Sequence, residues 1–129
     1  MDEHQDDTTE EITLLKAFRD GMIKRHFGIY VDSEGITLQG LDEASAATKG
    51  LRALRPHGIR ALEPLLDDPD PGVRAGAGEN LMFEMPEKAL PVLQALGNSA
   101  ELEAGMVARV ALYFYEKDKH LYGKDKSIN

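Results

Sequence analysis

The chain has 129 residues, enough for one domain with a modest core. It contains no cysteine, which excludes disulfide bonds, thiolate metal sites and cysteine nucleophiles. No apolar run approaches the ~20 residues that span a bilayer, and the first residues are acidic, unlike those of a signal peptide. We therefore expect a soluble, cytoplasmic protein without membrane contact.

The net charge of −8 is concentrated at the start of the chain. Six acidic residues precede the first lysine or arginine: Asp2, Glu3, Asp6, Asp7, Glu10 and Glu11. The remainder carries only −2, which argues against nucleic-acid binding, although Arg52, Arg55 and Arg60 are local basic spots. Residues 1–11 are expected to form a flexible, solvated acidic leader; the alternative is a segment that steers the protein toward a basic partner.

The first helix is predicted from about Thr8 or Thr9 to His26, because apolar residues recur there at spacings of three and four. The pattern then breaks. Residues 28–40 contain β-forming side chains around an Asp-Ser-Glu-Gly turn, which predicts a small β-hairpin or an ordered loop. Residues 12–122 are assigned to one helical domain and residues 123–129 to a C-terminal tail.

Further helices are predicted over residues 42–55, 59–66, 72–84, 86–96 and 100–119, separated by proline, glycine and capping residues. Two of the predicted helices share a pattern, because Ala61-Leu62 and Leu65 recur as Ala89-Leu90 and Leu93 at an offset of 28 residues. A short helix precedes a longer one in both cases. The repeat predicts two stacked helix pairs after a leading helix and a half unit.

Residues 62–81 resemble a HEAT repeat. The residues on the family pattern are Leu62, Leu65, Leu66, Asp68, Pro69, Pro71, Val73, Arg74, Ala75, Ala77 and Leu81. The resemblance is weaker over residues 89–114, where the Asp-Pro turn is missing, and it covers about half the chain. It implies an all-α fold, a short HEAT-like α-solenoid of five or six helices. It also implies a structural role for Asp68, Asp70, Val73 and Arg74, since the Asp and Arg of such turns tie neighbouring units together.

Residue patterns for catalysis or metal binding are not found in the sequence. The four histidines are far apart and form no HExxH pair, and no G-x-S-x-G or phosphate-binding glycine loop is present. We therefore predict no enzyme activity, no cofactor and no metal site. Gly72, Gly76 and Gly78 lie in a predicted helix, where they indicate close approach of a neighbouring helix or a flat face for a partner.

Five residues are candidates for partner binding. Glu79, Asn80 and Glu84 lie near the glycine-rich face, where carboxylates could receive lysine or arginine, although a hydrated helix surface is the favoured explanation for any one of them. Three aromatic residues crowd one turn of the last predicted helix, so at least one should reach the surface. Tyr113 beside Glu116 is the preferred anchor there, and Tyr115 is the alternative.

Helix-pair repeats are surfaces for holding other macromolecules. The chain is also similar to small bacterial HEAT-like proteins, some of which are thought to be immunity proteins of polymorphic toxin systems. The resemblance implies a non-enzymatic binder that occludes a basic toxin domain. The alternative is a general adaptor or regulatory scaffold.

Overall fold

All regular structure in the described part of the chain is helical. The computed structural model describes residues 3–128, with side chains for residues 8–121. The elements in chain order are α1 (Glu3–Tyr30), α2 (Glu34–Arg52), the 3-10 helix η1 (Gly58–Asp67), α3 (Pro71–Leu81), α4 (Pro86–Gly97) and α5 (Leu102–Ile128). The predicted all-α class is therefore confirmed. Of these helices, none is long and apolar enough to cross a membrane.

The segment over residues 28–40 is helical, and the prediction of a β-hairpin or ordered loop there is wrong. α1 continues to Tyr30, and only three residues separate it from α2. Asp32 adopts a left-handed φ of 57°, and the Ser33 side chain caps α2 by accepting a hydrogen bond from the Ile36 amide. The β-forming side chains around this turn are overridden by helix packing, because Gly28 lies directly against Thr37 of α2.

Other helix boundaries also differ from the sequence-based prediction. α1 begins at Glu3, earlier than the predicted start near Thr8 or Thr9. α5 extends to Ile128, beyond the predicted helix end at residue 119. α3 ends at Leu81, and residues 82–84 form a turn before Pro86 starts α4. Residues 1, 2 and 129 lie outside the described range.

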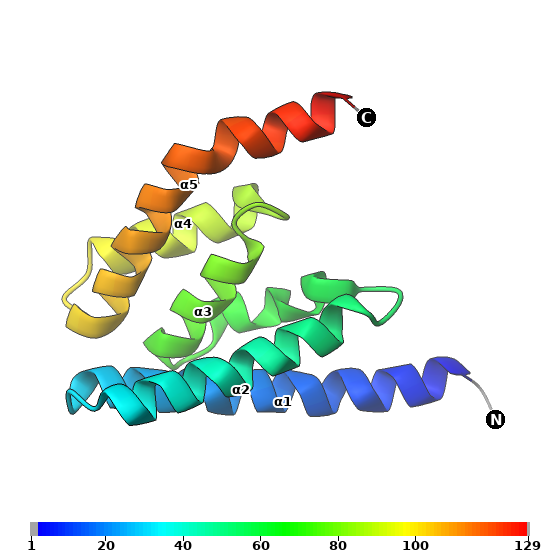
Figure 1. Cartoon of the computed structure of the whole chain (residues 1–129), viewed down its shortest axis with the longest axis horizontal. Coiled ribbons are helices and arrows are strands. Elements are labelled where there is room, and N and C mark those ends of the chain that lie inside the picture. The colour runs from blue at the N-terminus through cyan, green and yellow to red at the C-terminus, as the bar shows by residue number, and fades with distance from the viewer. Residues whose placement is uncertain (1–2, 129) are drawn as a thin grey trace.

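Glycines bring α1 and α2 together closely enough for their backbones to touch. A Cβ placed on Gly40 would lie 2.5 Å from both the backbone nitrogen of Arg25 and the backbone oxygen of Gly21. These distances are too short for any side chain, so only glycine fits at this position. Ala44 and Ala47 continue the same buried face of α2. The two helices therefore form a tight antiparallel hairpin, which lies along one side of the molecule in Figure 1.

α3 is the central helix of the fold. It contacts α1, η1, α4 and α5, and Figure 1 shows it rising between the α1/α2 hairpin and the α4/α5 pair. Its buried residues are Gly72, Val73, Ala75, Gly76, Ala77, Gly78 and Leu81. Two of its glycines allow close packing on different sides, because Gly76 faces Met22 of α1 and Gly78 faces Leu93 of α4. The helix-approach explanation of these glycines therefore matches the structure.

Candidate functional site

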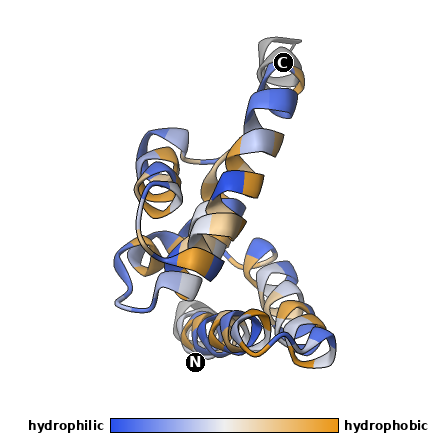
Figure 2. Ribbon diagram, turned by 90° about the vertical axis from the view of Figure 1, so that its left-hand side faces the viewer, coloured by the Kyte–Doolittle hydropathy of each residue, from blue (hydrophilic) through white to orange (hydrophobic). Residues whose placement is uncertain are grey.

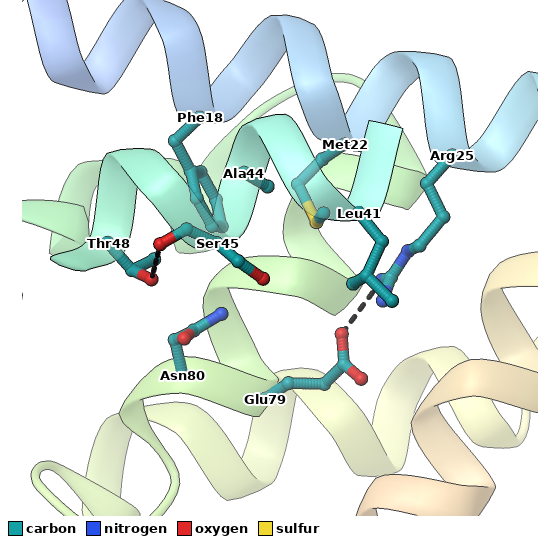
Figure 3. Close-up of a pocket in the computed structure, with 9 residues that line it drawn as sticks. All are labelled: Phe18, Met22, Arg25, Leu41, Ala44, Ser45, Thr48, Glu79 and Asn80. Atoms are coloured by element: carbon teal, nitrogen blue, oxygen red, sulfur yellow. Dashed lines mark hydrogen bonds and ion pairs between the residues drawn. The ribbon is translucent and has the colours of Figure 1, made fainter. Parts of the chain in front are cut away.

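A cleft of about 200 Å³ lies between the α1/α2 hairpin and α3 (Figure 3). Phe18 and Met22 of α1 and Ala44 of α2 are its buried apolar residues. Its polar residues are Arg25, Ser45, Thr48, Glu79 and Asn80, and Leu41 adds an exposed apolar side chain. The cleft thus joins an apolar interior to hydrogen-bonding groups supplied by three helices.

The ion pair between Arg25 and Glu79 links the two sides of this cleft. An Arg25 guanidinium nitrogen donates to Glu79 Oε1 at 2.7 Å, as the dashed line in Figure 3 marks. The Arg25 side chain is nearly buried, whereas the Glu79 side chain keeps 30% of its surface exposed. Close approach of α3 and α1 at Gly76 and Met22 sets the separation that this pair spans. The pair stabilises the cleft, and among the described side chains the second carboxylate oxygen of Glu79 accepts no hydrogen bond, so it can accept one from an outside donor.

Asn80 and the α2 hydroxyls provide further hydrogen-bonding groups. Asn80 donates its amide to the Gly76 carbonyl one turn earlier at 2.9 Å, which fixes the side chain and leaves its oxygen as an acceptor. Thr48 donates to the Ser45 carbonyl, whereas the Ser45 hydroxyl has no partner among the described residues. Such a mixture of fixed donors and acceptors suits recognition of a polar side chain or peptide group.

The turn before α3 holds the residues of the predicted repeat motif. Asp68 is buried and accepts hydrogen bonds from Arg19 of α1, the shorter at 2.7 Å. Asp70 caps α3 by accepting from the Gly72 and Val73 amides, and Arg74 donates to the Asp68 and Pro69 carbonyls. The Arg19–Asp68 ion pair therefore ties this turn to α1, while Arg74 stabilises the turn through its backbone carbonyls.

The environment of Asp68 favours its ionised form. Burial alone raises the pKa of Asp68, but the Arg19 hydrogen bond, the Asp70 amide and the charges of Arg19 and Arg74 outweigh burial and hold this pKa below its ordinary value. The same hydrogen bond, followed by the charge of Asp68, raises the pKa of Arg19. The carboxylate is thus a structural anion at neutral pH, with no proton to exchange.

The five predicted partner-binding residues fall in three places. Glu79 and Asn80 line the cleft and already have intramolecular partners. Glu84 lies in the turn after α3, with a carboxylate oxygen 3.9 Å from Nε of Arg60. Tyr113 and Glu116 lie on α5, where Tyr113 is 62% exposed and Glu116 pairs with Lys119. Tyr115, the alternative anchor, packs its ring 5.2 Å from that of Phe83.

The structure adds partners that the sequence could not indicate. Arg25 is 54 residues from Glu79, and Arg19 is 49 residues from Asp68, so neither pair has a local spacing signal. Arg52, Arg55 and Arg60, which the sequence marks as basic spots, share one open groove of about 380 Å³ with His57 and Glu84. His57 also pairs with Glu11 of α1 at 3.0 Å. The basic groove is therefore partly neutralised by acidic neighbours.

The residues with described side chains contain no group of three or more histidine, aspartate or glutamate side chains placed to hold a metal ion. Comparison with known proteins gives no family: no family model, no curated protein and no solved structure matches this chain. The function is therefore inferred from the chemistry of the cleft and of the helix surfaces.

Proposed function

We propose that this chain is a non-enzymatic protein-binding module, an immunity protein that acts in the cytoplasm by binding and occluding a cognate bacterial toxin. The observation that carries the proposal is the cleft between the α1/α2 hairpin and α3. Its small volume suits one side chain of a partner, and Arg25, Glu79 and Asn80 are already fixed by internal hydrogen bonds. Preorganised polar groups reduce the entropy lost on binding.

Charge supports a basic partner. The chain carries −8, and the Glu79 carboxylate at the cleft retains an oxygen for a lysine or arginine from outside. Long-range attraction between an acidic protein and a basic toxin domain raises the association rate and makes binding sensitive to salt. Such a pair needs no turnover by the binder, only occlusion of the toxin's active surface.

We also propose that η1 with α3, and α4 with α5, are two units of a short HEAT-like solenoid. In both units a short helix precedes a longer one, and the Asp68–Asp70 turn lies within the first unit. In this arrangement the α1/α2 hairpin takes the place of a leading unit, and the cleft lies between it and the first repeat. A repeat surface of this kind supports binding better than catalysis.

The test begins with a tagged pull-down of the full chain from lysate of its source, washed at low and then high salt. The proposal expects one stoichiometric partner that carries a toxin-like domain, that is released by salt and whose toxic activity the purified chain inhibits. If only substoichiometric housekeeping proteins are recovered, the proposal is overturned in favour of an adaptor or regulatory scaffold.

Two arginine substitutions on α2 then test the cleft. Ser45→Arg fills the cleft without removing either member of the Arg25–Glu79 pair, and it should weaken toxin binding at least tenfold. Ala46→Arg is the matched control: it adds the same charge at the next residue, which is exposed and does not line the cleft. Equal affinities of the two variants, measured by calorimetry, would show that the cleft is not the recognition site.

Glu79→Lys is a poor test by comparison. It would place a second cation beside the nearly buried Arg25 and would disturb the fold itself.

A further inference from the structure

α5 carries an exposed apolar stripe that is separate from the cleft. Its members are Leu102, Met106, Val110, Tyr113, Phe114 and Leu121. At 100° per residue these positions fall within one third of the helix circumference. The buried residues Ala104, Ala108 and Ala111 lie roughly 150° away and face the rest of the fold. Figure 2 shows hydrophobic residues recurring along α5 toward its C-terminal end.

The stripe is nearly symmetric along the sequence. With Lys117 in place of Phe114, residues 102, 106, 110, 113, 117 and 121 are separated by 4, 4, 3, 4 and 4 positions. This spacing reads the same in both directions, with its centre between Ala111 and Leu112. A surface that matches itself when reversed is the requirement for a two-fold, antiparallel interface between identical chains. We therefore propose that the α5 stripe binds the α5 stripe of a second copy of this chain.

In this register two kinds of apolar pair form, while Phe114 lies opposite the second copy's Arg109. Leu102 lies opposite the second copy's Leu121, Val110 lies opposite its Tyr113, and the aliphatic stem of Lys117 covers its Met106. Specific interfaces bury roughly 800 Å² per partner, and the exposed apolar side chains of the stripe are the surface that this pairing would cover.

Charge on α5 permits this pairing although the whole chain is acidic. The described side chains of α5 include three acidic residues and three basic ones, so this part of the helix is neutral with its histidine uncharged. Arg109 and Glu116 lie on the same edge of the stripe, and the same edges meet in an antiparallel pair. Each Arg109 then lies within about two residues of the second copy's Glu116. Glu103 and Asp118 lie toward the other edge, and Lys117 lies near the middle of the stripe, within about three residues of the second copy's Glu103.

The oligomeric state of the full chain tests the proposal. Sedimentation equilibrium over roughly 1–200 µM should show a monomer–dimer equilibrium. Val110→Glu places two like charges near the two-fold axis and should raise the dimer dissociation constant at least tenfold. Ile12→Glu is the matched control, since Ile12 is 62% exposed on α1 and Val110 is 51% exposed on α5. This control should dimerise like the natural chain, and circular dichroism should show that both variants are folded.

Cysteine cross-linking tests the direction of pairing, because the chain has no cysteine of its own. Tyr113→Cys lies near the two-fold axis and should form a disulfide-linked dimer under mild oxidation. Leu102→Cys should not link to itself, since its two copies would be about 28 Å apart along the helix axis. A mixture of Leu102→Cys and Leu121→Cys chains should link. A monomer at every concentration, or self-linking of Leu102→Cys, would overturn the proposal. The outcome is independent of toxin binding.

Discussion

α3 and α5 use small residues in opposite ways. α3 is surrounded by four other elements, and its glycines and alanines allow those neighbours to approach from several directions. α5 buries alanines on one face only, while its other face presents large apolar side chains to solvent. α3 is therefore packed on several sides, whereas α5 leaves one apolar face exposed. The fold is packed most closely around α3, whose Glu79 and Asn80 also line the cleft, while α5 carries the exposed apolar stripe.

The largest expected effect contrasts one leucine from each helix. Leu81→Ala on α3 removes a fully buried side chain and should lower the free energy of unfolding by about 3 kcal/mol. Leu102→Ala on α5 removes a side chain that is 77% exposed, and it should change the free energy of unfolding by less than about 0.5 kcal/mol in dilute solution. Urea denaturation of the two variants measures both values. Equal losses would remove the distinction between the helices.

A single added methyl group tests the packing of α3. Gly76→Ala improves intrinsic helix propensity, but the new Cβ would lie 2.7 Å from Cγ of the buried Met22. Overpacking should outweigh propensity, for a net loss of about 2 kcal/mol. Thermal unfolding followed by circular dichroism gives the change, and a stabilised variant would mean that α1 and α3 are not tightly packed.

The ion pair of Asp68 should give a contribution to the free energy of unfolding that is lost in acid. Asp68→Asn should cost about 1–2 kcal/mol at neutral pH, because a buried charge-assisted hydrogen bond to Arg19 is weakened. The folded-state pKa of Asp68 is lowered, so its contribution is present above the ordinary aspartate pKa and is lost as pH falls through the lower folded value.

The difference between Asp68→Asn and the natural chain should therefore shrink below about pH 4. The control is Glu116→Gln on α5, which breaks an exposed pair with Lys119 and should leave stability unchanged. Urea titrations at several pH values compare the three proteins. A difference that persists at low pH would mean that Asp68 acts by packing and not by charge.

The smallest expected effect is a gain at an open glycine. Gly35 lies in the first turn of α2, and a Cβ there would meet no atom within 4 Å. Gly35→Ala should therefore stabilise the fold by about 0.5 kcal/mol through the unfolded state. A loss at this position would indicate that the start of α2 is packed against something more than solvent.

Local signals allowed much of the helical architecture to be predicted. The Asp70 cap and Pro71 mark the start of α3, and Pro86 marks that of α4, as expected from the chain alone. A turn at Asp32 was expected, but the helices on both sides of it were not, because the β-forming neighbours carry a strand signal that only the contact between Gly28 and Thr37 overrides. A local reading of propensity contains no information about such tertiary contacts.

The candidate surfaces were predictable only in part. Exposure of Tyr113 follows from three aromatic residues that share one helix turn, and the structure places this side chain outside. By contrast, the internal partner of Glu79 lies 54 residues earlier in the chain, so nothing in the sequence near Glu79 indicates that it is already paired. The reversed symmetry of the α5 stripe is visible in the sequence only after its buried face is known.

Side-chain oxidation measures the contrast between the buried core around α3 and the exposed apolar stripe of α5. Hydroxyl-radical footprinting of the dilute chain should modify Met106, Tyr113 and Phe114 rapidly, while Met22 and Met85 stay protected by burial. At high concentration the three α5 side chains should become protected, and the protection of the two buried methionines should not change. Modification of Met22 or Met85 as fast as Met106, or α5 rates that are independent of concentration, would contradict a closed core that leaves one helix face for a second chain.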